Sequence, residues 1–173
     1  GSPSLAEQRR RAGKDVAGLA KKALAAGAAG AKLIEPSSVV TADWVRWKCR
    51  WGCNRYGTSW CCPPRSPEPA ETRRVLDSYR TALLVHFDND TRVTRAMVKL
   101  EREAFLSGWY RAFALGAGPC SLCKTCDLEH CRHEKARPSM EACGIDVFAT
   151  ARANGWPIQT LTDRSRPENA YGL

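Results

Sequence analysis

The sequence lacks a long apolar run. No stretch approaches the roughly 18 to 20 apolar residues that a membrane-spanning helix needs, and its start lacks the basic and then apolar pattern of a secretory signal. We therefore expect a cytoplasmic protein that does not enter a membrane. Also missing are a phosphate-binding loop, a dinucleotide-binding fingerprint and a Ser-His-Asp spacing, so the sequence predicts neither nucleotide-dependent nor serine-hydrolase chemistry.

Size and composition are those of an ordinary globular chain. The 173 residues are 43% hydrophobic and 26% charged, which is enough to build one buried core without disulfide bonds. We expect a single domain over residues 1–173.

Cysteine is the unusual component, with nine residues in the chain. A disulfide framework is typical of small secreted chains with an even number of cysteines. This chain is large enough to fold without such bonds, has an odd count and shows no export signal. Metal or cluster binding is therefore the favoured interpretation.

The formal charge is +9 and the isoelectric point is near 9.3, which by itself favours an anionic partner such as nucleic acid. That count treats the thiols as neutral. A [4Fe-4S] cluster on four thiolates adds about −2, so two clusters would lower the net charge to about +5. Part of the basicity then balances anionic clusters, and nucleic-acid binding is the weaker interpretation.

Hydrophobic periodicity and turn residues predict an α+β fold, or an open α/β sandwich, in which helices pack on a small sheet that carries two cysteine-rich loops. Helices are expected at 4–28, 71–79, from a cap at 88–91 through 115, and at 138–154. Strands are expected at 31–34 and 38–48, as a hairpin or as two strands of the sheet, and at 81–87 and 157–161. The cysteine loops are expected at about 49–69 and 119–138.

The second loop carries the sharper signal, Cys120-x2-Cys123-x2-Cys126-x4-Cys131. Thiols two residues apart let a tight loop wrap one cluster, as in the bacterial ferredoxin run. The last gap is one residue longer than in ferredoxins, and Arg132 stands where they have proline. The fourth cysteine of such a run can serve another cluster, so the place of Cys131 stays open.

Zinc is the alternative metal for this loop. Structural zinc sites usually hold two cysteine pairs across a longer spacer, whereas these four cysteines lie within twelve residues. His130 and His133 are candidate ligands under this alternative.

The first loop reads Cys49-x3-Cys53-x7-Cys61-Cys62-Pro63-Pro64. Adjacent cysteines rarely bind one metal together because their side chains point apart, so we expect one of this adjacent pair to be a ligand. A fourth ligand could be Cys143, or one iron could stay open to substrate.

These motifs resemble the domain-of-unknown-function 2284 family, whose members are described as predicted metal-binding, cysteine-rich proteins. The resemblance rests on the two cysteine runs, on Tyr56-Gly57 and Gly118-Pro119, and on the segment from Arg137 to Val147. It implies iron–sulfur binding, with Cys62 as the ligand, Cys61 as the extra residue and Cys143 as part of the pattern. The resulting ligand set is Cys49, Cys53, Cys62, Cys143, Cys120, Cys123, Cys126 and Cys131.

Two functions of different class follow. The first is an electron carrier or redox accessory with two closed [4Fe-4S] clusters, which needs a redox partner protein. The second is a reductase or sulfur-transfer enzyme with an iron held by three cysteines and open to a small-molecule substrate. A zinc-stabilised interaction module is a third alternative.

Some other side chains are candidates for a role in either function. Glu141 and Asp146 are candidate proton donors near Cys143, with helix capping or salt bridging as the alternative. Four tryptophans in the first cysteine region are expected to pack in the core, with cluster shielding, a partner surface or a dimer contact as alternatives: Trp44, Trp47, Trp51 and Trp60.

Overall fold

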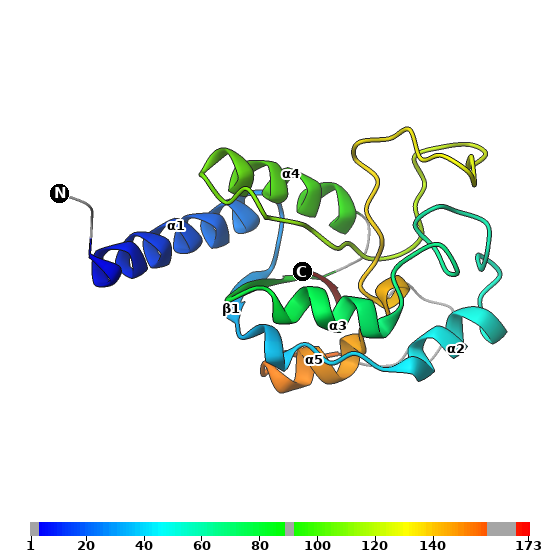
Figure 1. Ribbon diagram of the computed structural model, residues 1–173, viewed down its shortest axis with the longest axis horizontal. Helices are drawn as coiled ribbons and strands as arrows, with labels where there is room; N and C mark the ends of the chain where they lie inside the picture. The colour runs from blue at the N-terminus through cyan, green and yellow to red at the C-terminus, as the bar shows by residue number, and fades with distance from the viewer. Residues whose placement is uncertain (1–3, 89–91, 159–168) are drawn as a thin grey trace.

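The computed structural model describes residues 4–88, 92–158 and 169–173, and Figure 1 shows a small sheet with helices on both sides. The helices are α1 (Leu5–Ala25), α2 (Asp43–Gly52), α3 (Pro69–Asp77), α4 (Val93–Leu106) and α5 (Val147–Ala153). Two short 3-10 helices, η1 (Pro36–Ser38) and η2 (Glu141–Cys143), lie between them. The strands are β1 (Gly30–Ile34), β2 (Ala82–Phe87) and β3 (Ala170–Gly172). This arrangement confirms the predicted α+β class.

The sheet is antiparallel with the order β1-β2-β3, so β2 is the central strand. Leu33 of β1 pairs with Leu83, and Val85 pairs with Gly172 of β3. Gly172 has to be glycine because a Cβ there would come within 2.4 Å of the Met97 side chain, where α4 packs on the strand.

Two apolar cores lie on opposite faces of the sheet, because successive side chains of β2 point to opposite sides. Leu84 enters a core shared with α3, α5 and η2, whose members include Met140, Ile145 and Leu76. Val85 and Phe87 enter the other core, which α1 and α4 cover through Ala23, Met97 and Leu100. The cysteine loops extend from the end of the molecule opposite α1 (Figure 1).

The predicted strand over 38–48 is wrong. Residues 43–52 form α2, and Thr41 alone makes an isolated bridge, to Ile145. Tryptophan and valine favour both strands and short amphipathic helices, so the apolar positions of this segment did not distinguish the two. The hairpin is wrong as well, because β1 pairs with β2. The first cysteine run therefore starts inside a helix.

Two predicted helices are shorter than expected. α4 ends at Leu106, before a turn in which Gly108 has a φ of 98°, and Leu115 instead bonds to the chain end through its N–H to the Leu173 carbonyl at 2.7 Å. The helix predicted over 138–154 is divided into η2 and α5. Gly144 divides it, with a φ of 76° that only glycine adopts easily.

Some boundaries fall outside the described residues. Residues 89–91 of the cap predicted at 88–91 and most of the strand predicted at 157–161 lie there, and Pro157 and Ile158 are irregular. Strand β3 was not predicted. No helix in the described ranges is long and apolar enough to cross a bilayer.

Candidate metal centre

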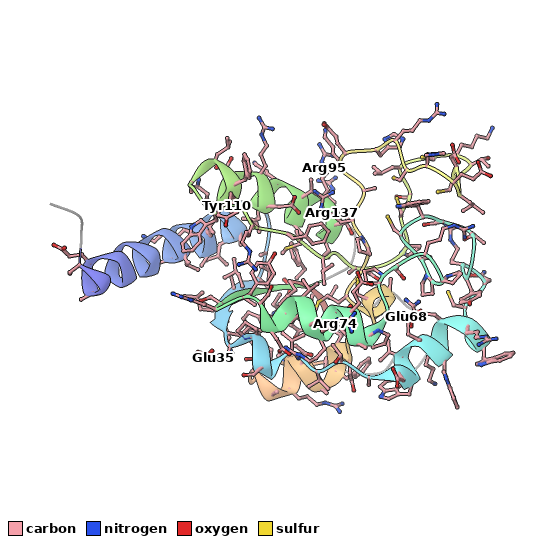
Figure 2. All side chains as sticks on the ribbon, viewed as in Figure 1. Glu35, Glu68, Arg74, Arg95, Tyr110 and Arg137 are labelled. Carbon is pink, nitrogen blue, oxygen red and sulfur yellow. The ribbon has the colours of Figure 1, made fainter. Side chains whose placement is uncertain are left out.

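Helix α2 presents the first cysteine, and Arg46 fixes this helix to the rest of the site. The Nη1 of Arg46 donates to the Ser66 hydroxyl at 2.8 Å, to the Pro67 carbonyl at 3.0 Å and to the Ala142 carbonyl at 2.7 Å. Its Nη2 pairs with Glu68 at 2.8 Å, which Figure 2 labels at the start of α3. One guanidinium thus joins α2, the end of the first loop and η2.

Cys49, Cys53 and Cys62 form what we call the first thiol group. Cys49 lies in the last turn of α2, Cys53 follows the helix, and Cys62 is buried in the loop. Burial raises the pKa of the Cys49 thiol, and the charges of the other two raise it further, whereas the Arg46 guanidinium lowers it. These three thiols are close enough to repel one another as thiolates, which a bound cation would relieve.

The second cysteine loop is attached to the fold at its base by a partly buried ion pair. Arg137 contacts Glu101 of α4 through Nη2 at 2.5 Å and through Nε at 2.8 Å, with both side chains less than one-fifth exposed. Glu101 also accepts the N–H of Ala114 at 2.7 Å. Figure 2 shows Arg137 beneath α4, where the chain returns from the loop. The pair therefore positions the end of the loop.

Four thiols of this loop act on one another. Cys123 and Cys131 are exposed, and Cys120 and Cys126 are partly buried. Desolvation raises the pKa of the Cys123 thiol, and the charges of Cys126, Cys120 and Cys131 add to the effect. After Cys126 the chain turns on Asp127, whose carboxylate accepts the N–H groups of Glu129 and His130 at 3.0 and 3.2 Å. The predicted cysteine run is thus brought together locally.

The two cysteine loops contact each other, although their cysteines are far apart in the sequence (Figure 1). The N–H of Trp60 donates to the sulfur of Cys126 at 3.3 Å. Arg65 donates to the Leu128 carbonyl at 2.8 Å, and Arg55 donates to the Cys120 carbonyl at 3.4 Å. The candidate centre is therefore one region with two groups of thiols.

Cys61 lies against the second loop, because Trp60 before it donates to the sulfur of Cys126. It is 6% exposed, and the charges of Cys120 and Cys131, and then that of its neighbour Cys62, act on its thiol. Burial is the largest cause, and together with these charges it raises the pKa of the Cys61 thiol to about 12. We therefore define the second thiol group as Cys61, Cys120, Cys123, Cys126 and Cys131. The family resemblance implies instead that Cys61 is the extra residue, whereas the spacing alone left the choice between Cys61 and Cys62 open.

Cys143 is in the apolar core, at 2% exposure. Its carbonyl accepts the hydroxyl of Thr72 at 2.7 Å. Burial raises the pKa of its thiol to about 12, and the charges acting on it belong to Arg46, Glu141 and Glu71, with no cysteine of the described chain among them. Its role as a ligand stays a prediction, because the structure does not bring it together with the other thiols.

The two predicted proton donors occupy different settings. Asp146 caps α5, because its carboxylate accepts the N–H of Ala149 at 2.9 Å. Glu141 acts by charge on both Cys49 and Cys143, so it faces the first thiol group. The surrounding protein raises the pKa of the Glu141 carboxyl. The residue is nevertheless exposed, so water screens part of this effect.

The tryptophans of this region are not core residues, contrary to the expectation from sequence. Trp47 and Trp51 are 69% and 75% exposed, and Trp44 and Trp60 are exposed as well. Trp44, Trp47 and Trp51 recur at intervals of three and four residues, so they share one side of α2. Beside them lies an open hollow of about 450 Å³, lined by Asp43, Trp44, Arg46, Trp47, Arg50, Tyr56, Pro64 and Glu68.

The donor set fits a metal that prefers thiolate. The described residues contain no group of three His, Cys, Asp or Glu side chains already gathered to hold a metal ion. They do contain eight thiols in the two groups, and all nine cysteines of the chain are free. Two thiols already accept backbone N–H groups, Cys126 from Trp60 and Cys53 from Arg55 at 3.4 Å. Such bonds stabilise thiolate and cluster sulfur.

Comparison with known proteins identifies the family. No curated protein and no solved structure matches the chain. A family model with the description "Predicted metal-binding protein (DUF2284)" matches residues 32–173, which include both cysteine loops and every cysteine. The chain therefore belongs to the DUF2284 family of predicted metal-binding proteins.

Proposed function

We propose that the chain is an iron–sulfur protein that holds two [4Fe-4S] clusters and passes single electrons to and from a partner protein. The observation that carries this proposal is the presence of two thiol groups in loops that contact each other through Trp60 and Cys126. Two clusters held in one region can exchange electrons, whereas two zinc ions there would have only a structural role.

The cysteine spacing supports iron–sulfur chemistry over zinc. The second loop supplies three thiols at gaps of two residues, as the bacterial ferredoxin run does. His130 and His133, the candidate zinc ligands, are both exposed. Neither has a hydrogen bond to its ring among the described residues that would orient it as a metal ligand.

The surface around the first thiol group supports a protein partner. Trp47 and Trp51 are exposed next to basic residues of the same helix, and the Arg50 guanidinium lies 5.0 Å from the centre of the Trp51 ring. Exposed aromatic residues with arginine are typical of protein interfaces. Cys53 is exposed beside them, so a cluster held there would have an edge near the docking partner.

The proposal is tested by the metal content and by the spectrum of the reduced protein. Iron, acid-labile sulfide and zinc are measured on protein purified without oxygen, and an EPR spectrum is recorded after dithionite reduction. About eight irons and eight sulfides per chain are expected. Zinc without sulfide would overturn the proposal.

A cluster-dependent enzyme is the second candidate function, and one observation favours it. The first thiol group contains three loop thiols, since Cys61 lies in the second group and Cys143 in the core. An iron with three protein ligands can bind a small molecule as a Lewis acid. The hollow along α2 would admit such a molecule, and Asp43 and Glu68 in its lining are carboxyl groups that could donate a proton there. A reduced EPR signal that changes on addition of cyanide would support this function over a closed carrier.

A further inference from the structure

We infer that Cys61 is a ligand of the second cluster, together with Cys120, Cys123 and Cys126, while its neighbour Cys62 is a ligand of the first. A single peptide bond then connects the two clusters. This inference rests on the proposed function and deepens it, because it assigns the one cysteine that the sequence left over.

The backbone before Cys61 already lies on the second loop. Trp60 donates its N–H to the sulfur of Cys126 at 3.3 Å, so the first loop touches one of the three closely spaced thiols. Arg65, on the other side of the cysteine pair, bonds to the second loop at the Leu128 carbonyl. Cys61 is thus held between two contacts with the second loop.

The backbone of Cys61 is fixed, and its side chain is shielded from water at 6% exposure. The backbone N–H donates to the hydroxyl of Ser59 at 3.1 Å, and Ser59 is itself buried at 3% exposure. Among the cysteines, the charge of Cys120 has the largest effect on the pKa of the Cys61 thiol. A ligand held in place before the metal binds loses little conformational freedom on binding, and burial protects a cluster from solvent.

Cys131 is the weaker candidate for the fourth position. It is exposed, and its thiol lies 3.9 Å from the His133 carbonyl, a long contact that holds it loosely. The gap of four residues before it is also longer than the gaps between the other three thiols. The second group therefore has five thiols for four positions, and Cys131 is the one left out.

Cys62 points to the other group. Its carbonyl accepts the N–H groups of Arg65 and Ser66 at 3.1 and 3.2 Å, which makes a tight turn after it. Its thiol acts by charge on Cys49, the helical member of the first group. Adjacent side chains leave the chain in different directions, so one dipeptide can serve two clusters although it cannot easily serve one.

The test counts the irons that remain when cysteines are removed singly and in pairs. Two cysteines of one cluster should behave as a unit, so removing both should cost no more iron than removing one. Cys61→Ala is expected to hold about four irons, and Cys61→Ala with Cys123→Ala should also hold about four. Cys61→Ala combined with Cys49→Ala should hold almost none, because each change then removes a different cluster.

Cys62 and Cys131 provide the matched controls. Cys62→Ala combined with Cys49→Ala should keep about four irons, and Cys62→Ala combined with Cys123→Ala should keep almost none. Cys131→Ala should keep about eight. The inference is overturned if Cys61→Ala keeps about eight irons, if its pair with Cys123→Ala keeps none, or if Cys131→Ala loses a cluster.

If the buried Cys61→Ala chain does not fold, Cys61→Ser is measured in its place, since it preserves the size of the side chain. A loss of about four irons, or about eight with a changed EPR spectrum of the reduced protein, supports the assignment. About eight irons with the unchanged spectrum contradicts it. Failure of the proposed function is recognised separately, because the unaltered chain would then contain no sulfide-bound iron.

Discussion

The backbone N–H of Trp60 donates a hydrogen bond of 3.3 Å to the sulfur of Cys126, although 66 residues separate the two. This contact joins the two cysteine loops at an atom that we assign to the second cluster. An N–H group directed at a ligand sulfur stabilises the more negative, reduced state of a cluster. If the second loop holds a cluster as proposed, the first loop would therefore help to set its reduction potential.

Removal of the metal should weaken the fold. The loops have few apolar contacts of their own, so a bound cluster contributes to the free energy of folding. Anaerobic treatment with a strong iron chelator is expected to lower the melting temperature in circular dichroism. At temperatures below this melting point, the helical circular dichroism signal should be retained, because the helices still pack on the sheet. An unchanged melting temperature after complete iron loss would contradict the role of the clusters in stability.

Cys123→Ala and Cys126→Ala should each remove one cluster and no more. Both thiols belong to the second group, so each variant is expected to lose about half of the iron and of the charge-transfer absorbance. Equal iron content in both variants and in the unaltered protein would contradict the assignment.

The two reduced clusters should interact magnetically. Consecutive Cα atoms are about 3.8 Å apart, so clusters held by Cys61 and Cys62 lie close together. The EPR spectrum of the fully reduced protein is expected to be broadened or split by spin coupling. The Cys123→Ala variant, which keeps the first cluster, should give the simple signal of one isolated cluster. Two non-interacting signals in the unaltered protein would contradict this arrangement.

Arg46→Ala should destabilise the chain by about 2–4 kcal/mol. The change removes bonds from a charged donor to Ser66, Pro67 and Ala142, and such bonds contribute about 1.5–3 kcal/mol each when nothing replaces them. The Ser66 hydroxyl still donates to the Ala142 carbonyl, so part of the loss is offset. Arg50→Ala on the same helix is the matched control. Because Arg50 is exposed, its replacement should change the free energy of unfolding by about 0.5 kcal/mol or less. Anaerobic urea unfolding measures both variants, and equal effects would contradict the role of Arg46.

Breaking the Arg137–Glu101 pair should lower the free energy of unfolding more than breaking an exposed pair does. Both side chains are less than one-fifth exposed, so Arg137→Ala leaves a partly buried carboxylate without its cation and should cost about 1.5–3 kcal/mol. Asp77→Ala breaks the pair with Arg73, in which Asp77 is 63% exposed, and should cost about 1 kcal/mol or less. The same urea titration compares them. Similar costs would show that the second loop is not anchored through Arg137.

Gly144→Ala should lower the free energy of unfolding more than Gly27→Ala does. Both glycines have positive φ values, 76° and 101°, so both substitutions strain the backbone. A Cβ at Gly144 would also come within 2.3 Å of Pro69, whereas one at Gly27 would meet nothing within 4 Å. The difference in unfolding free energy is expected to be about 1–3 kcal/mol. Equal losses would indicate that η2 and α3 are not in close contact.

The sequence by itself indicated a cysteine-rich chain of a predicted metal-binding family and much of the local structure. Thiol spacing depends on a few consecutive residues, so the cysteine run from Cys120 was readable without a structure, as was the family. The continuous apolar run of β2 and the glycine that ends the η2 turn also act locally. The α+β class followed from these elements.

Tertiary structure decided which residues meet across long distances. The pairing of β1 with β2 and the placement of Cys143 in the core depend on the apolar surface that each segment can bury against others. The helix over 43–52 buries only Val45, and the bonds of Arg46 to distant segments hold it in place. The assignment of Cys61 and Cys62 to different thiol groups also depends on tertiary packing. Their neighbouring positions are fixed by the chain, but the group that each thiol faces is fixed by the packing of one loop on the other.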